Sequence, residues 1–385
     1  MDANNRVGEG AGRLNAGAGA CIAAVEPIVV DVPLRQPVHG VHGVTSVQRS
    51  VLVRVESDEG VDGWGNVDPT LGYSAMSAED VASAVRALAP HLIGLDPFNV
   101  RRALAAMDQA LDGRFEAKAA VEMALIDFTG RALGVPAHVL LGGRVRDEVP
   151  LNAWIGTVPP AQAAREALDW LGRGFTTAKI KVSGGTSDGV ERVAAVRAAV
   201  GDRMALRVDF NESLGAAGAP AFIERLEPFG LTLVEQPIPR DQIDGLAAIR
   251  RAIRIPLMAD ESVTDAASLL EIIRRDAADI VKVKTMKQGG LLRTLAMVDM
   301  AAAAGLRVVI GHGFGLTLST LAEATLAAAS DVVLPGCEAV GPLKMAGDVV
   351  ADPVDLSGGR PRLRDTPGIG ARVDPDAIKR YRVDG

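Results

Sequence analysis

Charged side chains recur through the second half of this 385-residue chain at a nearly constant spacing. Each comes at or just after the end of a short β-branched run, and neighbours lie 24 to 28 residues apart, the length of one strand plus one helix. The series is Lys181, Asp209, Glu235, Asp260, Lys284, His312 and Glu338. A single residue of this kind would be an ordinary loop residue or helix N-cap. A series in phase with the strands indicates one functional site.

Three acids of this series predict a metal site. Asp209, Glu235 and Asp260 would present three carboxylates from adjacent strands to one point, where they repel each other unless a hard divalent cation such as Mg²⁺ accepts their oxygens. Asn211 is either a support for such a ligand or a turn residue. Glu261 should point away from Asp260 if strand geometry continues, so only one of these two neighbours is expected to bind the cation.

Lysines flank the acids in the sequence. Lys179 and Lys181 share one face of the strand before the acids, and Lys284 follows the strand after them. We expect mutual repulsion and partial burial to lower the pKa of these ammonium groups toward neutrality, which makes them usable general bases. A substrate carboxylate bound by the cation would hold its α-carbon between Lys181 and Lys284, while Lys179 stabilises the charge that develops as the α-proton leaves.

The elements that must position these residues alternate in type. Runs typical of strands lie at 178–182, 205–209, 232–235, 256–259, 280–284 and 307–310. Ala-, Leu- and Arg-rich helical stretches separate them, and this alternation indicates a parallel sheet. About eight repeats fit between residues 150 and 345, enough to close a barrel whose strand ends meet at one mouth. A doubly wound open sheet is the alternative, but no Gly-rich phosphate-binding fingerprint follows the first strand.

The first part of the chain has strands before helices, which predicts an α+β domain. Residues 22–35 and 50–57 are expected to be strands, the second followed by the turn-rich stretch DEGVDGWG, and 116–133 is expected to be a helix. The Gly-rich stretch 33–46 is a candidate lid over a ligand.

Composition limits the class of protein. Apolar residues make up 48% of the chain and charged residues 23%, as in a globular protein. The net charge of −7 and the absence of a dense Lys/Arg block argue against nucleic acid as a partner, and no apolar run is long enough to span a membrane. With only Cys21 and Cys337, a reducing compartment, the cytoplasm, is expected. Residues 1–20 are expected to be a disordered extension rather than a signal peptide.

These motifs together resemble the enolase superfamily and, within it, the muconate lactonizing enzyme (muconate cycloisomerase) branch of the mandelate racemase/muconate lactonizing enzyme family. The motifs are GWG at 63–65, the stretch 117–150, KIK at 179–181, VDFNE at 208–212, VEQP at 234–237, ADES at 259–262, KTMKQGG at 284–290 and CEAVGP at 337–342. The likeness covers about residues 25–380, and the set is highly specific to the superfamily.

The resemblance implies an α/β protein, with an α+β capping domain at 21–145 over a (β/α)₇β modified TIM barrel at 146–354. The segment 355–385 is expected to pack back on the cap. The resemblance makes Asp209, Glu235 and Asp260 the ligands of Mg²⁺ or Mn²⁺. It makes Lys181 and Lys284 the acid/base groups on the two faces of the substrate, with Lys179 the electrostatic neighbour of Lys181. Lys282 shares a strand face with Lys284, so the sequence alone does not exclude it.

Further residues are assigned to the pocket with alternatives open. Glu338 matches an acid in the last barrel strand of cycloisomerase-like members. His312 is a substrate contact, an auxiliary acid or a satisfied loop histidine, and Trp154 either lines the pocket or belongs to the core. His39 and His42 lie in the candidate lid, and without a third ligand nearby they are not expected to form a metal pair of their own.

Two departures from the family pattern bear on function. Asn66 stands where relatives often have Glu, and Val340 replaces the second acid of the strand-eight pair expected in dipeptide epimerases. The leading hypothesis is a metal-dependent isomerase of a small-molecule carboxylate, cycloisomerase-like, acting through an enediolate. The alternatives are an N-acylamino-acid racemase or o-succinylbenzoate-synthase-like enzyme, a dehydratase that uses His312, and a non-catalytic binding protein. The resemblance implies a homo-oligomer, a dimer or an octamer.

Overall fold

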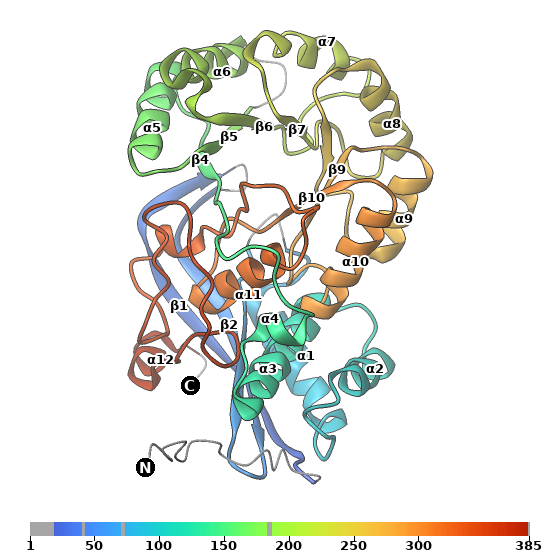
Figure 1. The fold of residues 1–385 in the computed structure, drawn as a ribbon, viewed down its shortest axis with the longest axis vertical. Helices are drawn as coiled ribbons and strands as arrows, with labels where there is room; N and C mark the ends of the chain where they lie inside the picture. The colour runs from blue at the N-terminus through green and yellow to red at the C-terminus, as the bar shows by residue number, and fades with distance from the viewer. Residues whose placement is uncertain (1–18, 41–42, 71–73, 183–186, 384–385) are drawn as a thin grey trace, which may run out of the picture.

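Two sheets organise the chain in the computed structural model, which describes residues 19–40, 43–70, 74–182 and 187–383. A three-stranded antiparallel sheet has the order β1-β2-β3, and a seven-stranded sheet has the order β10-β9-β8-β7-β6-β5-β4 with all its strand pairs parallel. In Figure 1 the first sheet and its helices, blue to cyan, lie below the second, whose helices run from green to orange.

The N-terminal part contains the first sheet and the helices that cover it. The strands are β1 (Ile22–Gly40), β2 (Gly43–Ser57) and β3 (Asp62–Val67). The helices are α1 (Ala78–Leu88), the short η1 (Ala89–His91), α2 (Val100–Ala110), α3 (Phe115–Leu133) and α4 (Ala137–Leu140). Most of α3 is buried, because it packs against β2 and β3 and also contacts α10 (Leu291–Ala303) of the second part. This arrangement confirms the predicted α+β organisation.

The third strand is where the sequence prediction was wrong. The GWG stretch was expected to be a turn, yet it forms the middle of β3. A Cβ atom on Gly63 would overlap the backbone of Ala124, and one on Gly65 would overlap the backbone of Ala120. These glycines therefore serve close packing of α3 on the strand rather than a turn. The turn itself lies just before them, at residues 58–60.

The second part alternates strands and helices, as the sequence predicts. The strands are β4 (Ala153–Ile155), β5 (Thr177–Lys181), β6 (Ala205–Asp209), β7 (Leu233–Glu235), β8 (Leu257–Ala259), β9 (Ile280–Val283) and β10 (Arg307–Ile310). The helices are α5 (Pro160–Gly172), α6 (Ser187–Val200), α7 (Ala219–Glu224), α8 (Ile243–Ala252), α9 (Ala266–Arg274), α10 (Leu291–Ala303) and α11 (Thr317–Ala328), with the short η2 (Gly201–Arg203) and η3 (Glu227–Phe229).

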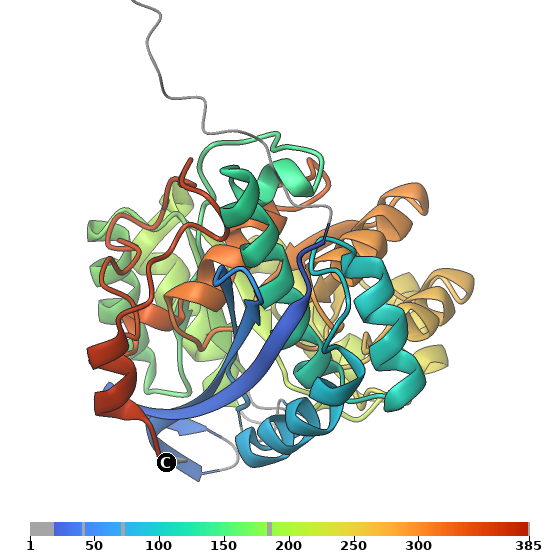
Figure 2. The same ribbon diagram turned by 90° about the horizontal axis from the view of Figure 1, so that it is seen from below.

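An irregular segment after α11 closes the ring. It makes parallel bridges on both sides, from Val333 to Val308 of β10 and from Cys337 to Leu151 just before β4. Further along, the Glu338 N–H donates to the Ile310 carbonyl at 2.8 Å. The segment thus takes the place of an eighth strand and confirms the modified barrel with its α+β cap. Figure 2 shows the barrel helices, green to orange, behind the blue sheet of the cap.

The end of the chain returns to the first sheet. After η4 (Gly341–Leu343), helix α12 (Pro375–Tyr381) lies beside β1, where the Val383 N–H donates to the Val29 carbonyl at 3.0 Å. The domain boundaries themselves stay a prediction, and most of the expected extension 1–20 lies outside the described residues.

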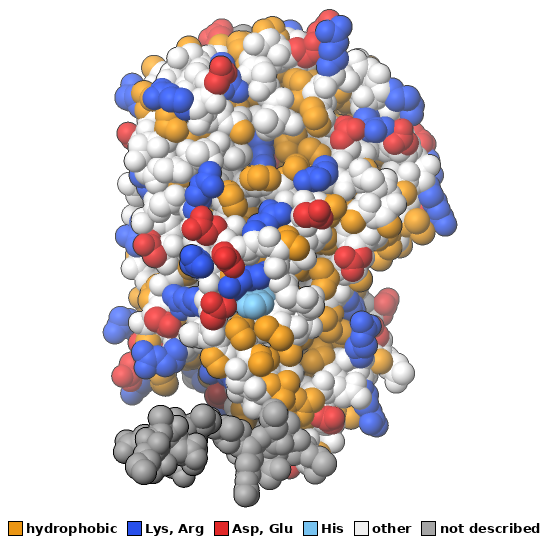
Figure 3. Space-filling model, viewed as in Figure 1, with side chains coloured by type: hydrophobic (Ala, Val, Ile, Leu, Met, Phe, Trp, Pro, Cys, Tyr) orange, Lys and Arg blue, Asp and Glu red, His pale blue; other side chains and the backbone are white. Residues whose placement is uncertain are grey.

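Among the described residues, no helix has both the length and the apolar character that a bilayer span requires. Acidic and basic side chains are interspersed over the face in Figure 3.

Glu122 of α3 ties the cap to the barrel. Its buried carboxylate accepts the N–H groups of Leu291 and Leu292, each at 2.8 Å, at the start of α10. Gly290 leaves room for it, since a Cβ there would lie 2.5 Å from Glu122 Oε2. We expect Glu122→Ala to lower the free energy of unfolding by roughly 2–4 kcal/mol, because the two N–H groups at the start of α10 lose their carboxylate acceptor. Urea denaturation checks this, with exposed Glu191→Ala as a control that should change little. Equal stability of the two variants would contradict it.

Candidate active site

Adjacent barrel strands bring three carboxylates together at the mouth. Lys181 of β5 is in register with Asp209 of β6, and Asp209 with Glu235 of β7, so these side chains leave the sheet on the same face. Asp260 follows the last residue of β8, the next strand in the sheet. Asp209, Glu235 and Asp260 are each no more than 1% exposed. We call these three residues the carboxylate row.

Two buried lysines bridge the members of the row. Lys179 Nζ lies 2.8 Å from an oxygen of Asp209 and 2.8 Å from Glu235 Oε1. Lys282 Nζ lies 3.0 Å from the same Glu235 oxygen and 3.5 Å from Asp260 Oδ2. Neighbouring carboxylates therefore share an ammonium group, which offsets part of the repulsion between these buried acids.

Two further lysines lie at opposite ends of the carboxylate row. Lys181 Nζ is 2.6 Å from Asp209 Oδ2 and 2.6 Å from Asn211 Oδ1. Lys284 Nζ is 2.7 Å from Asp260 Oδ1. Because the strand order is β5-β6-β7-β8-β9, these two amines flank the row from opposite sides. The spacing of the sequence predicts this placement.

The expected lowering of the lysine pKa is wrong for Lys179. Burial acts to lower its pKa, but the carboxylates of Asp209, Glu235 and Glu338 raise it well above the usual value. Lys282 behaves in the same way. Neighbouring lysines along one strand repel each other, but the acids that adjacent strands place against Lys179 have the larger effect on its pKa.

Glu235 carries an atom that the protein leaves without a partner. Its Oε2 is buried and has no hydrogen-bond donor within the described part of the chain. Burial and the neighbouring Asp209 carboxylate raise the pKa of Glu235 to about 8. A buried acceptor in this state calls for an explanation, and a ligand at the site is one.

The chemistry of the row fits a hard divalent cation. All its donors are carboxylate oxygens, the type that Mg²⁺ and Mn²⁺ take, and Glu235 Oε2 is available. Among the described residues, however, no group of three or more His, Cys, Asp or Glu side chains is already arranged around one point as a metal centre. The ammonium groups of Lys179 and Lys282 lie between the carboxylates instead.

Asn211 and Glu261 form a short chain of contacts from one end of the row. Asn211, in the left-handed region with φ of 42°, accepts from Lys181 and donates from Nδ2 to Glu261 Oε1 at 3.1 Å. The condition under which Glu261 was expected to point away from Asp260, continued strand geometry, is not met. Strand β8 ends at Ala259, so the alternation of a strand does not extend to these two acids.

Glu338 and His312 lie on the barrel-closing side. Glu338 accepts from Lys179 at 3.2 Å and from Lys282 at 2.5 Å, and these lysines overcome burial to lower its pKa to about 2. His312 is buried, with Nε2 lacking a partner among the described residues. Burial, followed by the charges of Lys284 and Lys344, lowers the pKa of His312 to about 3, so its ring is neutral at physiological pH.

Sequence reasoning missed Lys344. Its Nζ lies 4.5 Å from the ring centroid of Trp154 on β4 and 4.1 Å from that of Phe314. Trp154 also packs on Trp170, with 4.5 Å between the ring centroids. Its ring therefore belongs to the core and also lines the barrel mouth beside Lys344. Lys344 stands outside the strand-phased series, and its position six residues after Glu338 was the one signal in the sequence.

The candidate lid at 33–46 is built mainly from β1 and β2 rather than from an irregular loop. It reaches the barrel mouth, because the Arg35 N–H donates to the Lys344 carbonyl and the Ala346 N–H donates to the Pro33 carbonyl, both at 2.8 Å. His42 lies outside the described residues, and for His39 only the backbone pairing with Val44 is described.

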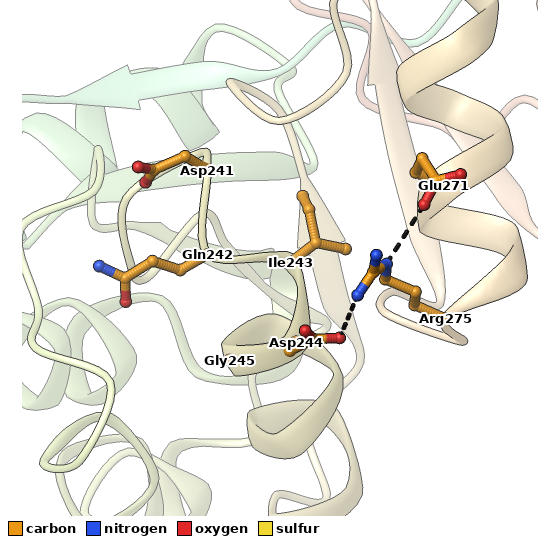
Figure 4. A pocket seen from close by; sticks show the side chains of 7 residues that line it. All are labelled: Asp241, Gln242, Ile243, Asp244, Gly245, Glu271 and Arg275. Atoms are coloured by element: carbon orange, nitrogen blue, oxygen red, sulfur yellow. Dashed lines mark hydrogen bonds and ion pairs between the residues drawn. The ribbon is translucent and has the colours of Figure 1, made fainter.

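A surface pocket lies apart from these residues. It is lined by Asp241, Gln242, Ile243, Asp244, Gly245, Glu271 and Arg275 (Figure 4). Arg275 is paired with Asp244 at 2.6 Å and with Glu271 at 3.2 Å. No residue of the carboxylate row lines this pocket, and its arginine is already paired with two acids.

Known families match both parts of the chain. Residues 24–142 match the mandelate racemase / muconate lactonizing enzyme N-terminal domain, and residues 162–377 match the enolase C-terminal domain-like family. An N-succinyl-L-Arg/Lys racemase of Bacillus cereus is 30% identical over 94% of this chain and 98% of its own length. A chloromuconate cycloisomerase of Cupriavidus pinatubonensis is 33% identical over the same shares of the two chains.

A solved structure shows the same architecture. The muconate lactonizing enzyme from Pseudomonas fluorescens, complexed with muconolactone, superposes with a TM-score of 0.91 at 30% identity, over 95% of this chain and all of that one. The agreement thus extends over the cap and the barrel together. The chain belongs to the mandelate racemase/muconate lactonizing enzyme family of isomerases in the enolase superfamily.

Proposed function

We propose that this protein is a divalent-metal-dependent isomerase of a small-molecule carboxylate, of the muconate cycloisomerase type, which removes or delivers a proton at the α-carbon. The observation that carries the proposal is the placement of Lys181 and Lys284 at opposite ends of the carboxylate row, 2.6 Å from Asp209 and 2.7 Å from Asp260. Two amines on opposite sides of one bound carboxylate can reach both faces of its α-carbon.

Each residue has a distinct task in this proposal. Asp209, Glu235 and Asp260 would hold Mg²⁺ or Mn²⁺, and the bound cation would supply positive charge against the negative charge that develops on the substrate carboxylate. Lys181 Nζ and Lys284 Nζ take or deliver the α-proton. Lys179 and Lys282 neutralise the buried carboxylates, and their high pKa values keep both ammonium groups charged.

Several reactions use these same residues. Proton delivery to one face of the α-carbon gives a cycloisomerase, and proton transfer on both faces gives a racemase of N-acylated amino acids. The relatives described above are named for a cycloisomerase and for a racemase activity. An o-succinylbenzoate-synthase-like reaction needs the same groups. A dehydratase is less well supported, because His312, with its pKa lowered to about 3, carries no extra proton for a leaving hydroxyl. A non-catalytic role fits poorly with a complete set of acids and flanking lysines.

We also propose a cellular location and an oligomeric state for the enzyme. Cys21 and Cys337 are both free, which supports a reducing cytoplasmic location. We also infer a homo-oligomer, a dimer or an octamer, from the family resemblance alone.

Exchange of substrate α-protons with D₂O tests the proposed function. We expect NMR to show metal-dependent exchange for at least one member of a panel of carboxylic acids that includes cis,cis-muconate, N-succinyl amino acids and their simpler monocarboxylate analogues. The same panel with EDTA in place of Mg²⁺ is the control and should give no exchange. Absence of both exchange and product formation across the whole panel with Mg²⁺ would favour the binding-protein alternative.

A further inference from the structure

Contacts with several segments hold Lys344 in a fixed position at the barrel mouth. Its ammonium group lies over two aromatic rings, 4.5 Å from the Trp154 centroid and 4.1 Å from the Phe314 centroid, and donates to the Gly313 carbonyl. Its backbone is held from the other side, since Lys344 O accepts the Arg35 N–H of β1 at 2.8 Å. The barrel and the cap thus fix the side chain and its main chain together.

The surroundings of Lys344 differ from those of the other lysines at the mouth. A carboxylate lies within 4.0 Å of the ammonium group of each of Lys179, Lys181, Lys282, Lys284 and Lys287. In the described part of the chain, Lys344 has no such carboxylate, and its polar partner is a neutral carbonyl. Burial, and next the charge of Lys181, lower the pKa of Lys344 to about 7. An arriving carboxylate would supply the missing counter-charge.

We propose that Lys344 determines substrate specificity by binding a second carboxylate, remote from the one whose α-carbon reacts, so that the preferred substrates are dicarboxylates. This inference rests on the proposed function. Lys344 packs on Trp154 of β4, the strand paired with β5, which places it on the Lys181 side of the carboxylate row. The rings of Trp154 and Phe314 form apolar walls beside the ammonium group, suited to the carbon chain that joins two carboxylates.

Other ligand chemistries fit this position less well. The Lys344 ammonium already lies over the Trp154 and Phe314 rings and would repel a second cation, so an amine-bearing substrate end is disfavoured. A neutral end would leave the Lys344 charge without an anionic partner in a partly buried place. The single ammonium provides a point contact for one carboxylate rather than the several donors that a phosphate usually receives.

Pairs of substrates that differ only in the charge of the remote group test this inference. The probes are N-succinyl-L-alanine and cis,cis-muconate, each compared with the monoamide in which the remote carboxylate is replaced. For Lys344→Met we expect kcat/KM for the active dicarboxylate to fall about 100-fold, mainly through KM, and kcat/KM for its monoamide to change less than about threefold. Lys344→Arg should keep the preference for the dicarboxylate, and exposed Lys379→Met is the matched control that should leave both substrates unchanged.

Binding measurements separate failure of this inference from failure of the proposed function. Isothermal titration of the same four probes into wild type and Lys344→Met reports on Lys344 whether or not turnover occurs. Loss of dicarboxylate affinity in Lys344→Met, with monoamide affinity retained, supports the inference even if no proton exchange is seen. Equal losses for both members of a pair, no loss at all, or wild-type preference for the monoamides would overturn it.

Discussion

Lys284→Met is expected to abolish racemisation of an α-centre, with kcat reduced by about 10³–10⁴-fold. Methionine keeps an unbranched side chain of similar length but cannot carry a proton. Lys284 Nζ lies at the Asp260 end of the carboxylate row, 2.7 Å from that carboxylate, while Lys181 remains at the Asp209 end. The variant should therefore lose proton transfer on one face only. A one-face cycloisomerisation, by contrast, would keep part of its rate.

The stereochemistry of exchange is the decisive measurement for this prediction. In D₂O, Lys284→Met should still exchange the α-proton of one substrate enantiomer through Lys181, and Lys181→Met should show the opposite preference. Lys379→Met, at an exposed position of α12, should behave as wild type. If both enantiomers kept exchanging in each single variant, the assignment of the two lysines to opposite faces would be wrong.

The phase of the charged residues made the barrel mouth predictable. Lys181, Asp209 and Glu235 are in mutual register on neighbouring strands, and a constant repeat length is what such register requires. Spacing along the chain could therefore place these residues together without knowledge of side-chain conformations. The alternation of side chains along a strand does not apply to Glu261, because strand β8 is only three residues long and ends before the two acids.

What the sequence could not show depends on contacts between distant segments. From the sequence alone, the glycines of β3 are typical of a turn. Only the packing of α3 against them shows why a strand has glycine at these positions. The pKa of Lys179 depends on acids from three other segments, Asp209, Glu235 and Glu338, which outweigh its burial. Lys344 acquires its surroundings from β4, from the connection after β10 and from β1. In each case the role of the residue depends on a contact with a segment that is distant in the sequence. The local sequence pattern therefore could not show it.

Glu235→Gln is expected to remove the stabilisation that Mg²⁺ confers and to reduce α-proton exchange by at least about 10³-fold. Lys179 and Lys282 both contact Oε1 of Glu235, so a glutamine carbonyl can accept in its place. Oε2 is the buried atom without a partner in the described part of the chain, and there the variant has an amide nitrogen that cannot bind a cation. At pH 7 the raised pKa, about 8, already favours a neutral Glu235 when no cation is bound. The cation-free variant should therefore fold normally.

Thermal unfolding with and without Mg²⁺ distinguishes loss of the ion from loss of the fold. A ligand at 100 times its dissociation constant stabilises the native state by about 2.7 kcal/mol, so Mg²⁺ should raise the Tm of wild type visibly. Glu235→Gln should unfold near the Tm of cation-free wild type both with and without Mg²⁺. The matched control is Glu271→Gln in the surface pocket, which should keep the full Mg²⁺ response because that carboxylate pairs with Arg275 away from the barrel mouth. An unchanged Mg²⁺ response in Glu235→Gln would show that the ion is held elsewhere, since the middle member of the row cannot be dispensable for a cation that all three carboxylates share.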